Sequence, residues 1–364
     1  MEHISELLAI LNGYFGWNKA RMSCFAKMLI ALMVTRSINL NKIACFFTSE
    51  AQILSRYRRL QRFFAEFTID YDRVAGFIFR LFFVDNGQWF LTMDRTNWKW
   101  GKLDINILTL GIAFKGTAIP IYWTLLDKRG NSDTKERIEL IQTFIDRFGK
   151  ECIKGILADR EFIGKDWFNW LLKNKLSFVI RIKNNTLTTN SKGLAIDIDA
   201  LFYGLKPGEQ RQIKWKRKIW GHELYLTGLR LSDGELLMVA SDKLYDDAIK
   251  IYGLRWQIET LFACLKGRGF NFEDTHITEL ERIKKVFVLL SIAFCWAHKT
   301  GEWQNEVKPI KLKKHGRPAV SLFRYGLDCI VNAIAKMFYH PEIFRECLTK
   351  LGVRSNEALT DYSL

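Results

Sequence analysis

Apolar positions recur every three or four residues in the first part of the chain, and this spacing predicts helices over residues 1–86. The clearest stripe consists of Ile53, Tyr57, Leu60, Phe64 and Phe67. Ser49 and Gln52 precede it at the spacing of a capping box. Four arginines lie on its flanks and far side: Arg56, Arg58, Arg59 and Arg62. Such a face is usually just solvated, and the alternative is a phosphate-contacting helix of a small DNA-binding module.

Between residues 87 and 184, short β-prone runs alternate with amphipathic segments. The expected strands cover residues 89–93, 105–114, 117–126, 152–158 and 177–182, and the expected helices cover residues 134–147 and 167–173. Lys115-Gly116 between two of these runs predicts a hairpin. Three adjacent strands followed by alternating helix and strand predict an α/β fold with a mixed sheet flanked by helices.

The second half of the chain begins with another β-rich stretch and then becomes helical. Alternating runs over residues 210–219 and 223–231, between turn signals, predict a β-rich insertion over residues 185–245. Helix returns from about Asp246 and continues to the end of the chain, with one basic break over residues 308–318. That break holds five Lys or Arg and no acidic residue, and it is either a solvated linker or a phosphate-binding loop.

Composition adds a charge argument to this pattern. The 364 residues include 55 Lys and Arg against 39 Asp and Glu, a net charge of +16. With 48% hydrophobic and 14% aromatic residues, the chain is too apolar for a disordered basic tail, and its length predicts two or three domains. The surplus indicates a polyanionic partner, with nucleic acid ranked before an anionic membrane surface.

Basic and aromatic residues interleave in the expected insertion. This strip consists of Lys214, Trp215, Lys216, Arg217, Lys218 and Trp220. An edge strand protected by lysines is one explanation, and a nucleic-acid surface that uses stacking and cation–π contacts is the other.

Several classes of protein are excluded by what the sequence contains. The longest apolar stretch, residues 286–298, is too short to span a bilayer, and the start lacks the features of a secretory signal. The seven cysteines are scattered and form no Cys-x-x-Cys pair, which is typical of reduced cysteines in a cytoplasmic protein and not of a disulfide frame or zinc site. The chain also has no P-loop motif, which argues against nucleotide hydrolysis.

Four polar side chains are regularly spaced near residue 260. Tyr252, Arg255, Glu259 and Lys266 are separated by 3, 4 and 7 residues. On a single helix over residues 251–270 they would fall within an arc of roughly 60°. The simpler explanation is an ion-pair ladder, since Arg255 and Glu259 have i,i+4 spacing.

Two aspartates favour a functional explanation of this spacing over a simple ion-pair ladder. Asp94 and Asp159 each follow a β-prone run, so they can converge with Glu259 at one end of a sheet. Three carboxylates there would hold two Mg²⁺ ions about 4 Å apart, the arrangement used for phosphodiester chemistry. In an extended strand Glu161 points the same way as Asp159 and is an alternative ligand.

Together these residues resemble the DDE transposases of bacterial insertion sequences. The resemblance covers residues 89–266 and rests on Asp94 in MDRTNW, on Asp159 in LADREF and on the helix pattern Tyr-x2-Arg-x3-Glu-x6-Lys. That pattern, formed by Tyr252, Arg255, Glu259 and Lys266, is the signature of one branch of the family.

The resemblance implies a ribonuclease-H-like core in which Asp94, Asp159 and Glu259 are catalytic and bind Mg²⁺, with Mn²⁺ able to substitute. It implies cut-and-paste transposition: nicking at the element ends, release through a DNA hairpin, and strand transfer into target DNA. The implied partners are double-stranded DNA (terminal inverted repeats and target) and a second copy of the chain on paired ends, in the bacterial cytoplasm at the nucleoid and without a membrane.

Several residues are expected to contact DNA. The signature residues Tyr252, Arg255 and Lys266 would contact phosphates near the cleaved strand, and Trp256 would lie near a flipped base. Further contacts are expected from Trp220, with Trp215 as its alternative, and from the basic break. In that break the expected contacts are Lys313, Lys314 and Arg317.

The resulting expected organisation has four parts. They are a helical N-terminal DNA-binding region at 1–86, a ribonuclease-H-like catalytic core at 87–184 and 246–300, a β-rich insertion at 185–245 and a helical C-terminal region at 301–364. Two alternative functions remain, a structure-specific Mg²⁺-dependent nuclease and a non-catalytic DNA-binding regulator descended from a transposase.

Overall fold

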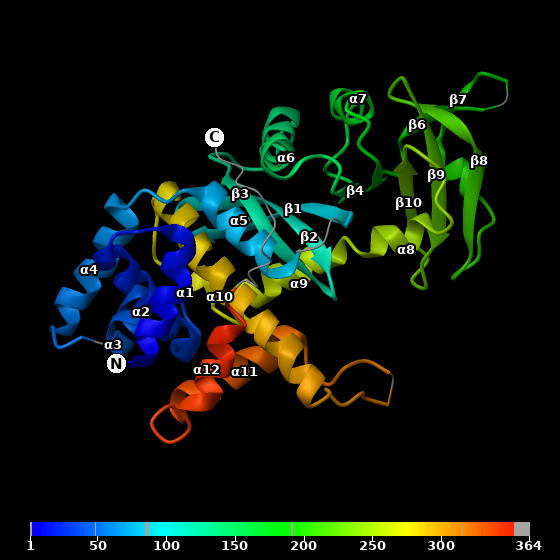
Figure 1. The fold of residues 1–364 in the computed structure, drawn as a ribbon. Coiled ribbons are helices and arrows are strands. Elements are labelled where there is room, and N and C mark those ends of the chain that lie inside the picture. The colour runs from blue at the N-terminus through cyan, green and yellow to red at the C-terminus, as the bar shows by residue number, and fades with distance from the viewer. Residues whose placement is uncertain (1, 48, 84–86, 191, 315, 353–364) are drawn as a thin grey trace. The chain divides into compact units, whose positions relative to one another are not determined.

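The computed structural model describes residues 2–47, 49–83, 87–190, 192–314 and 316–352 (Figure 1). The chain divides into two compact units, one of Met1–Asp85 with Ala263–Leu364 and one of Asn86–Phe262. The expected domain boundaries stay a prediction. The two compact units divide the chain differently, because residues 263–300 group with the N-terminal helices. His315 and the end of the expected C-terminal region, residues 353–364, lie outside the described residues.

The first unit is built from helices of two chain segments, one before and one after the second unit in the sequence. Its α-helices are α1 (Glu2–Phe15), α2 (Lys19–Thr35), α3 (Leu40–Phe46), α4 (Ile53–Glu66), α5 (Tyr71–Phe82), α10 (Leu280–Val307), α11 (Leu322–Ala335) and α12 (Pro341–Thr349). A short 3₁₀ turn, η2, covers Phe272–Asp274. The long helix α10 packs against α2, α4, α5 and α11, so its buried middle forms the centre of this unit.

The start of α4 differs from the sequence prediction. The Ser49 hydroxyl accepts a hydrogen bond from the Ala51 N–H at 3.2 Å, which closes a turn before the helix. Gln52 takes the N-cap position, and its side chain makes no capping hydrogen bond. The capping box predicted from Ser49 and Gln52 is therefore wrong, because the Ser49 side chain is used two residues away.

The arginines of α4 divide into two groups. Arg56 binds the carbonyls of Ser49 and Ala51, and Arg59 binds the Ala20 carbonyl. Arg58 and Arg62 are exposed. Half of the basic face thus has structural partners within the unit.

The second unit is built on an eight-stranded sheet with the order β3-β2-β1-β4-β5-β10-β9-β8. Its strands are β1 (Trp89–Trp100), β2 (Leu103–Phe114), β3 (Thr117–Leu125), β4 (Ile153–Ala158), β5 (Phe178–Arg181), β8 (Gln210–Ile219), β9 (His222–Arg230) and β10 (Leu236–Ser241). The predicted hairpin is confirmed: β2 and β3 pair antiparallel, and Lys115 and Gly116 between them both have positive φ.

The first five strands in the order form a ribonuclease-H-like mixed sheet, as expected. β1, β2 and β3 are antiparallel neighbours, and β4 and β5 run parallel to β1. The predicted helices appear as α6 (Thr134–Phe148), between β3 and β4, and α7 (Lys165–Lys173), between β4 and β5. Asp133 and Glu136 start α6 with a complete capping box.

The predicted β-rich stretch does contain strands, and most of them extend the same sheet. β10 pairs antiparallel with β5, and β9 and β8 follow outward, so β8 is an edge strand. Only the short strands β6 (Leu187–Thr189) and β7 (Ala195–Asp197) form a separate two-stranded sheet, which η1 (Ile198–Phe202) follows.

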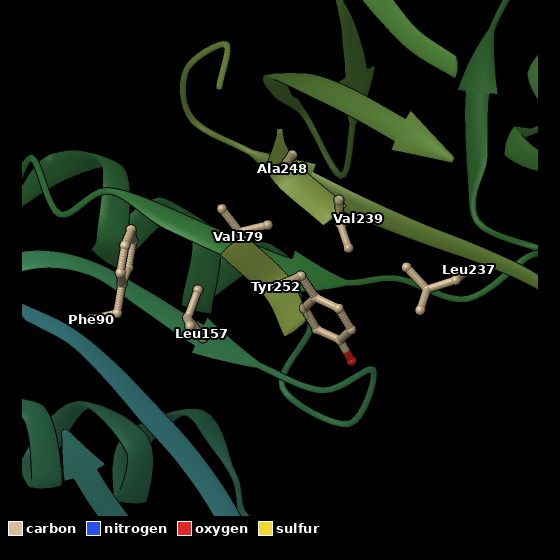
Figure 2. Packing of buried hydrophobic residues seen from close by; sticks show 7 residues of the cluster. All are labelled: Phe90, Leu157, Val179, Leu237, Val239, Ala248 and Tyr252. Atoms are coloured by element: carbon tan, nitrogen blue, oxygen red, sulfur yellow. The ribbon is translucent and has the colours of Figure 1, made fainter. Parts of the chain in front are cut away.

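Helices cover both faces of this sheet. On one face the ring of Phe178 lies 5.1 Å from that of Phe168 in α7. Successive side chains of a strand alternate, so Val179 points to the other face. There it joins a buried cluster with Ala248 and Tyr252 of α8 (Ala248–Gly253), as Figure 2 shows. The remaining members of the cluster come from the strands and are Phe90, Leu157, Leu237 and Val239.

Among the described helices, none is by itself both long and apolar enough to cross a membrane. Only α2 and α3 taken together reach that threshold by length and composition, and they are bent by 102°.

The contact between α10 and α11 predicts a strong effect of one methyl group. A Cβ on Gly326 would overlap the carbonyl oxygen of Ala297, and backbone cannot move aside as a flexible side chain can. We expect Gly326→Ala to lower the free energy of unfolding by about 2 to 3 kcal/mol in urea denaturation followed by circular dichroism. The control is Gly13→Ala in α1, where a Cβ meets no atom within 4 Å and helix propensity favours Ala by up to about 1 kcal/mol. Equal stability of the two variants would contradict this packing.

Candidate active site

Strand register places the two aspartates next to each other. The parallel pairing of β1 with β4 ends at Met93 and Ala158, and Asp94 and Asp159 are the residues that follow. β1 is longer than the predicted run 89–93, because its remaining residues pair with β2 as far as Trp100. Asp94, within β1, and Asp159, directly after β4, therefore lie at the same level of adjacent parallel strands.

The segment that carries the signature is broken between two helices. α8 ends at Gly253 and α9 (Trp256–Leu265) begins after Arg255, so the prediction of a single helix over residues 251–270 is wrong. The N–H groups of Leu254 and Arg255 bond three residues back, which tightens the chain. The Arg255 carbonyl also accepts a hydrogen bond from Thr92 Oγ1 of β1 at 3.4 Å. This contact ties the break to the strand that carries Asp94.

Arg255 is the centre of the site, and only 3% of its surface is exposed. Its Nη1 donates to Asp94 Oδ2 at 3.2 Å, and its Nη2 donates to Glu259 Oε1 at 2.6 Å. The expected i,i+4 ion pair is thus present, and it is half of a bridge between two carboxylates. The guanidinium also lies 5.6 Å from the ring centre of Tyr252 and 5.5 Å from that of Trp256.

Tyr252 connects the hydrophobic core to the second aspartate. Its side chain is completely buried in the cluster of Figure 2, and its hydroxyl donates to Asp159 Oδ1 at 3.3 Å. Burial raises the pKa of Tyr252 above its ordinary value, so the hydroxyl keeps its proton and remains a donor. Trp256 packs edge-to-face on Tyr252 and is 45% exposed.

Asp94 is held in an environment that disfavours its charge. Burial, partly opposed by the Arg255 cation and reinforced by the charges of Glu161 and Asp159, raises the pKa of Asp94 to about 7. The mutual effect of these acidic groups shows that their charges interact within the site. Asp94 therefore loses its proton only near neutral pH, even beside the Arg255 cation.

Glu161, the alternative to Asp159, has another partner. Arg95 donates to both of its carboxylate oxygens at 2.7 Å. Arg95 is held in turn by Asn106 and by the Gly130 carbonyl. Sequence reasoning missed this role of Arg95, although it directly follows Asp94 in the MDRTNW motif. The ion pair favours Asp159 over Glu161 as the second acidic residue of the site.

The other residues predicted to contact DNA lie elsewhere. Trp220 is half-buried and stacks on Phe168 with ring centres 5.3 Å apart, whereas Trp215 on the edge strand β8 is 78% exposed. Lys266 belongs to the first unit and forms an ion pair with Glu273 at 2.8 Å. The predicted contacts of the basic break are exposed in the connection between α10 and α11. They are Lys313, Lys314 and Arg317.

The donor chemistry of the site fits a hard divalent cation, because Asp94, Asp159 and Glu259 offer only carboxylate oxygens. In the described residues, however, no group of three or more His, Cys, Asp or Glu side chains is arranged to hold a metal ion. The cation between Asp94 and Glu259 in this arrangement is the Arg255 guanidinium.

The site is thus built on two aspartates that are aligned across adjacent parallel strands of a mixed sheet. The family described as Transposase DDE domain matches residues 85–296, which is more than half of the chain, and the chain belongs to that family. Among solved structures, a similar one is a cryo-EM structure of a piggyBac transposase synaptic complex with hairpin DNA. It has 12% sequence identity and a TM-score of 0.42, and the match covers 99% of this chain and 85% of that one. No curated protein matches this chain.

The raised pKa of Asp94 predicts a pH-dependent cost to stability when metal is absent. Because the folded-state pKa of about 7 exceeds the ordinary 3.8, the group stabilises the fold at low pH, and that stability is lost as pH rises through 7. Asp94→Asn removes this cost. We expect the unfolding free energy of the variant, relative to wild type, to increase by about 2 to 3 kcal/mol from pH 5 to pH 8 in EDTA.

The matched control for this measurement is Asp146→Asn, which removes an exposed carboxylate from α6. A stability difference between Asp94→Asn and wild type that does not change with pH would contradict the buried position of Asp94.

The bridge made by Arg255 predicts a second stability effect. Arg255→Met leaves the buried Asp94 without its cation, and we expect the unfolding free energy at pH 8 to fall by about 3 kcal/mol. Adding Asp94→Asn should restore part of this loss. Arg129→Met breaks an exposed Arg–Asp pair in the same unit and should cost less than about 1 kcal/mol. Similar losses for the two arginines in thermal and urea denaturation would show that the bridge contributes little.

Proposed function

We propose that this member of the transposase DDE domain family cleaves DNA strands at element ends and joins them to target DNA, with Asp94, Asp159 and Glu259 as its catalytic carboxylates. The proposal is supported by the register of the two aspartates and by the Arg255 bridge from Asp94 to Glu259. The motifs resemble a branch that transposes by cut and paste through a DNA hairpin, and we extend that route to this chain.

The proposed metal ligands are the same three carboxylates, with Mg²⁺ as the ion and Mn²⁺ able to replace it. When bound, such ions activate the attacking oxygen and stabilise the leaving oxygen of a phosphodiester. The residues of the chain prepare the ligands. Tyr252 orients Asp159 through its hydroxyl, and Glu259 must exchange its contact with Arg255 to serve as a ligand. Because Glu259 is 52% exposed, it is the more accessible end of the bridge.

The proposed DNA contacts begin with the residues next to the carboxylates. An arginine released from Glu259 beside bound ions is placed to bind a substrate phosphate. Trp256, partly exposed and next to Arg255, is the proposed contact for a flipped base. Tyr252 is completely buried, and its contribution in this proposal is made through Asp159. Lys266, Trp220 and the basic connection between α10 and α11 are proposed as further contacts with the duplex.

The proposed assembly is a homodimer that holds two element ends, because cut-and-paste chemistry acts on both ends of one element. Its proposed partners are terminal inverted repeats and target DNA. Its proposed location is the bacterial cytoplasm, in association with the nucleoid.

The test is cleavage of a plasmid that carries the DNA flanking this reading frame on both sides. We expect wild type to nick at the element ends with Mg²⁺ or Mn²⁺ and to show no cleavage in EDTA. Asp94→Ala, Asp159→Ala and Glu259→Ala should each reduce nicking to background, since each removes a ligand. Glu161→Gln is the matched control and should retain metal-dependent nicking, because the Glu161 oxygens bind Arg95.

The same reaction separates this function from its alternatives. Joining of the released 3′ end to a second plasmid identifies a transposase, and nicking without joining identifies a nuclease. Specific binding of the ends without cleavage under any metal condition would identify a regulator and would refute the proposal.

A further inference from the structure

The connection between α10 and α11 is an exposed two-stranded ribbon. Leu312 and Pro318 form an antiparallel bridge, and the Lys313 N–H donates to the Arg317 carbonyl at 2.8 Å. On the other side of the bridge, the Ala319 N–H donates to the Lys311 carbonyl at 2.8 Å. The described residues between 311 and 320 are all exposed.

The start of the ribbon is fastened to both helices that flank it. The Ile310 N–H donates to Asn305 Oδ1 of α10 at 2.8 Å, and the Tyr325 hydroxyl of α11 donates to the Lys308 carbonyl at 3.1 Å. At the tip, the Gly316 N–H donates to the Lys313 carbonyl, and Gly316 has a φ of 77°. The connection is therefore a built hairpin.

The pairing separates the side chains of the ribbon into two faces. Directly opposite residues share a face, and successive residues alternate. Leu312 and Pro318 therefore lie on one face with Ile310 and Val320, which continue the same register. Lys311, Lys313 and Arg317 lie on the other face with Ala319. The ribbon thus has one apolar face and one face whose only long side chains are cations.

The composition of the ribbon identifies the chemistry that it can bind. Residues 308–320 contain five Lys or Arg, no Asp or Glu, and no Ser, Thr, Asn or Gln. The ribbon therefore lacks the amides that read adenine. Residues 308–320 also contain no Phe, Tyr or Trp, so the ribbon lacks the aromatic platforms on which single-stranded bases stack. Lys and Arg side chains bind the phosphates of a duplex. Their other duplex target is guanine, and a comparison of two probe sequences separates the two modes of binding.

We propose that the ribbon 308–320 lays Lys311, Lys313 and Arg317 along the backbone of duplex DNA and supplies affinity that is independent of sequence. This inference rests on the proposed function, since it assigns one surface of the same enzyme to duplex outside the cleavage site.

The experiment measures duplex binding by the full chain with fluorescence anisotropy, over salt concentrations from about 50 to 200 mM. The probes are a duplex with an element end and a duplex of scrambled sequence. For the triple variant Lys311→Gln, Lys313→Gln, Arg317→Gln, we expect the salt slope to fall by about 3. The affinity should fall by about 10- to 100-fold, equally for both probes. The conservative variant Lys311→Arg, Lys313→Arg, Arg317→Lys should bind as wild type does, which excludes a fold defect.

Two control variants make the result specific to one face of the ribbon. Arg129→Gln, Lys135→Gln and Arg345→Gln together remove three cations that are each paired with an acid, and the slope should change little. Leu312→Ser changes the opposite face and should leave binding unchanged. A loss of affinity for Leu312→Ser as large as for the triple variant would overturn the proposal in favour of apolar insertion.

The remaining outcomes distinguish this inference from the proposed function. If the triple variant binds both probes with the wild-type slope while wild type still nicks element ends, the ribbon proposal fails alone. If it loses affinity only for the element-end probe, the ribbon reads sequence and the proposal fails. If wild type neither binds duplex nor nicks it, both proposals fail together.

Discussion

The buried guanidinium of Arg255 is the interaction on which the site depends. Strand register forces Asp94 and Asp159 together, and burial makes the charge of Asp94 unfavourable, as its raised pKa shows. A cluster of acids in such a place is tolerable only if a positive charge accompanies it. Arg255 supplies that charge from within the chain, because it contacts Asp94 and Glu259 at the same time. The protein can therefore fold with its acidic site already assembled.

That position of Arg255 follows from the backbone around it. At the break between α8 and α9, the Arg255 carbonyl accepts a hydrogen bond from Thr92 of β1. Tyr252, one turn earlier, is fixed by the cluster of buried side chains between α8 and the sheet (Figure 2). The hydrophobic core thereby positions a polar group, because the Tyr252 ring packs in the core while its hydroxyl donates to Asp159.

Local patterns predicted most of this architecture, and the exceptions have physical causes. Alternation and turn residues identify β2 and β3 because Lys115 and Gly116 adopt the conformation that their positions require. Motifs identify Asp94, Asp159 and Glu259 because their residue types suit one chemistry. The break at Arg255 was not predictable, since helical periodicity continues across it and the contact that Arg255 makes there is with a strand distant in sequence. The same applies to Arg95, whose partner Glu161 is distant in sequence.

The extension of the sheet by β10, β9 and β8 has a structural consequence. These strands are joined to β5 by backbone hydrogen bonds in one continuous series, and β5 is the neighbour of β4, at whose end Asp159 lies. The exposed edge strand β8 is therefore connected, ladder by ladder, to the strand that ends before Asp159, and Trp215 lies in the stretch between Ile213 and Arg217 where the β8–β9 register shifts. Backbone pairing thus fixes where this edge of the sheet stands relative to Asp159.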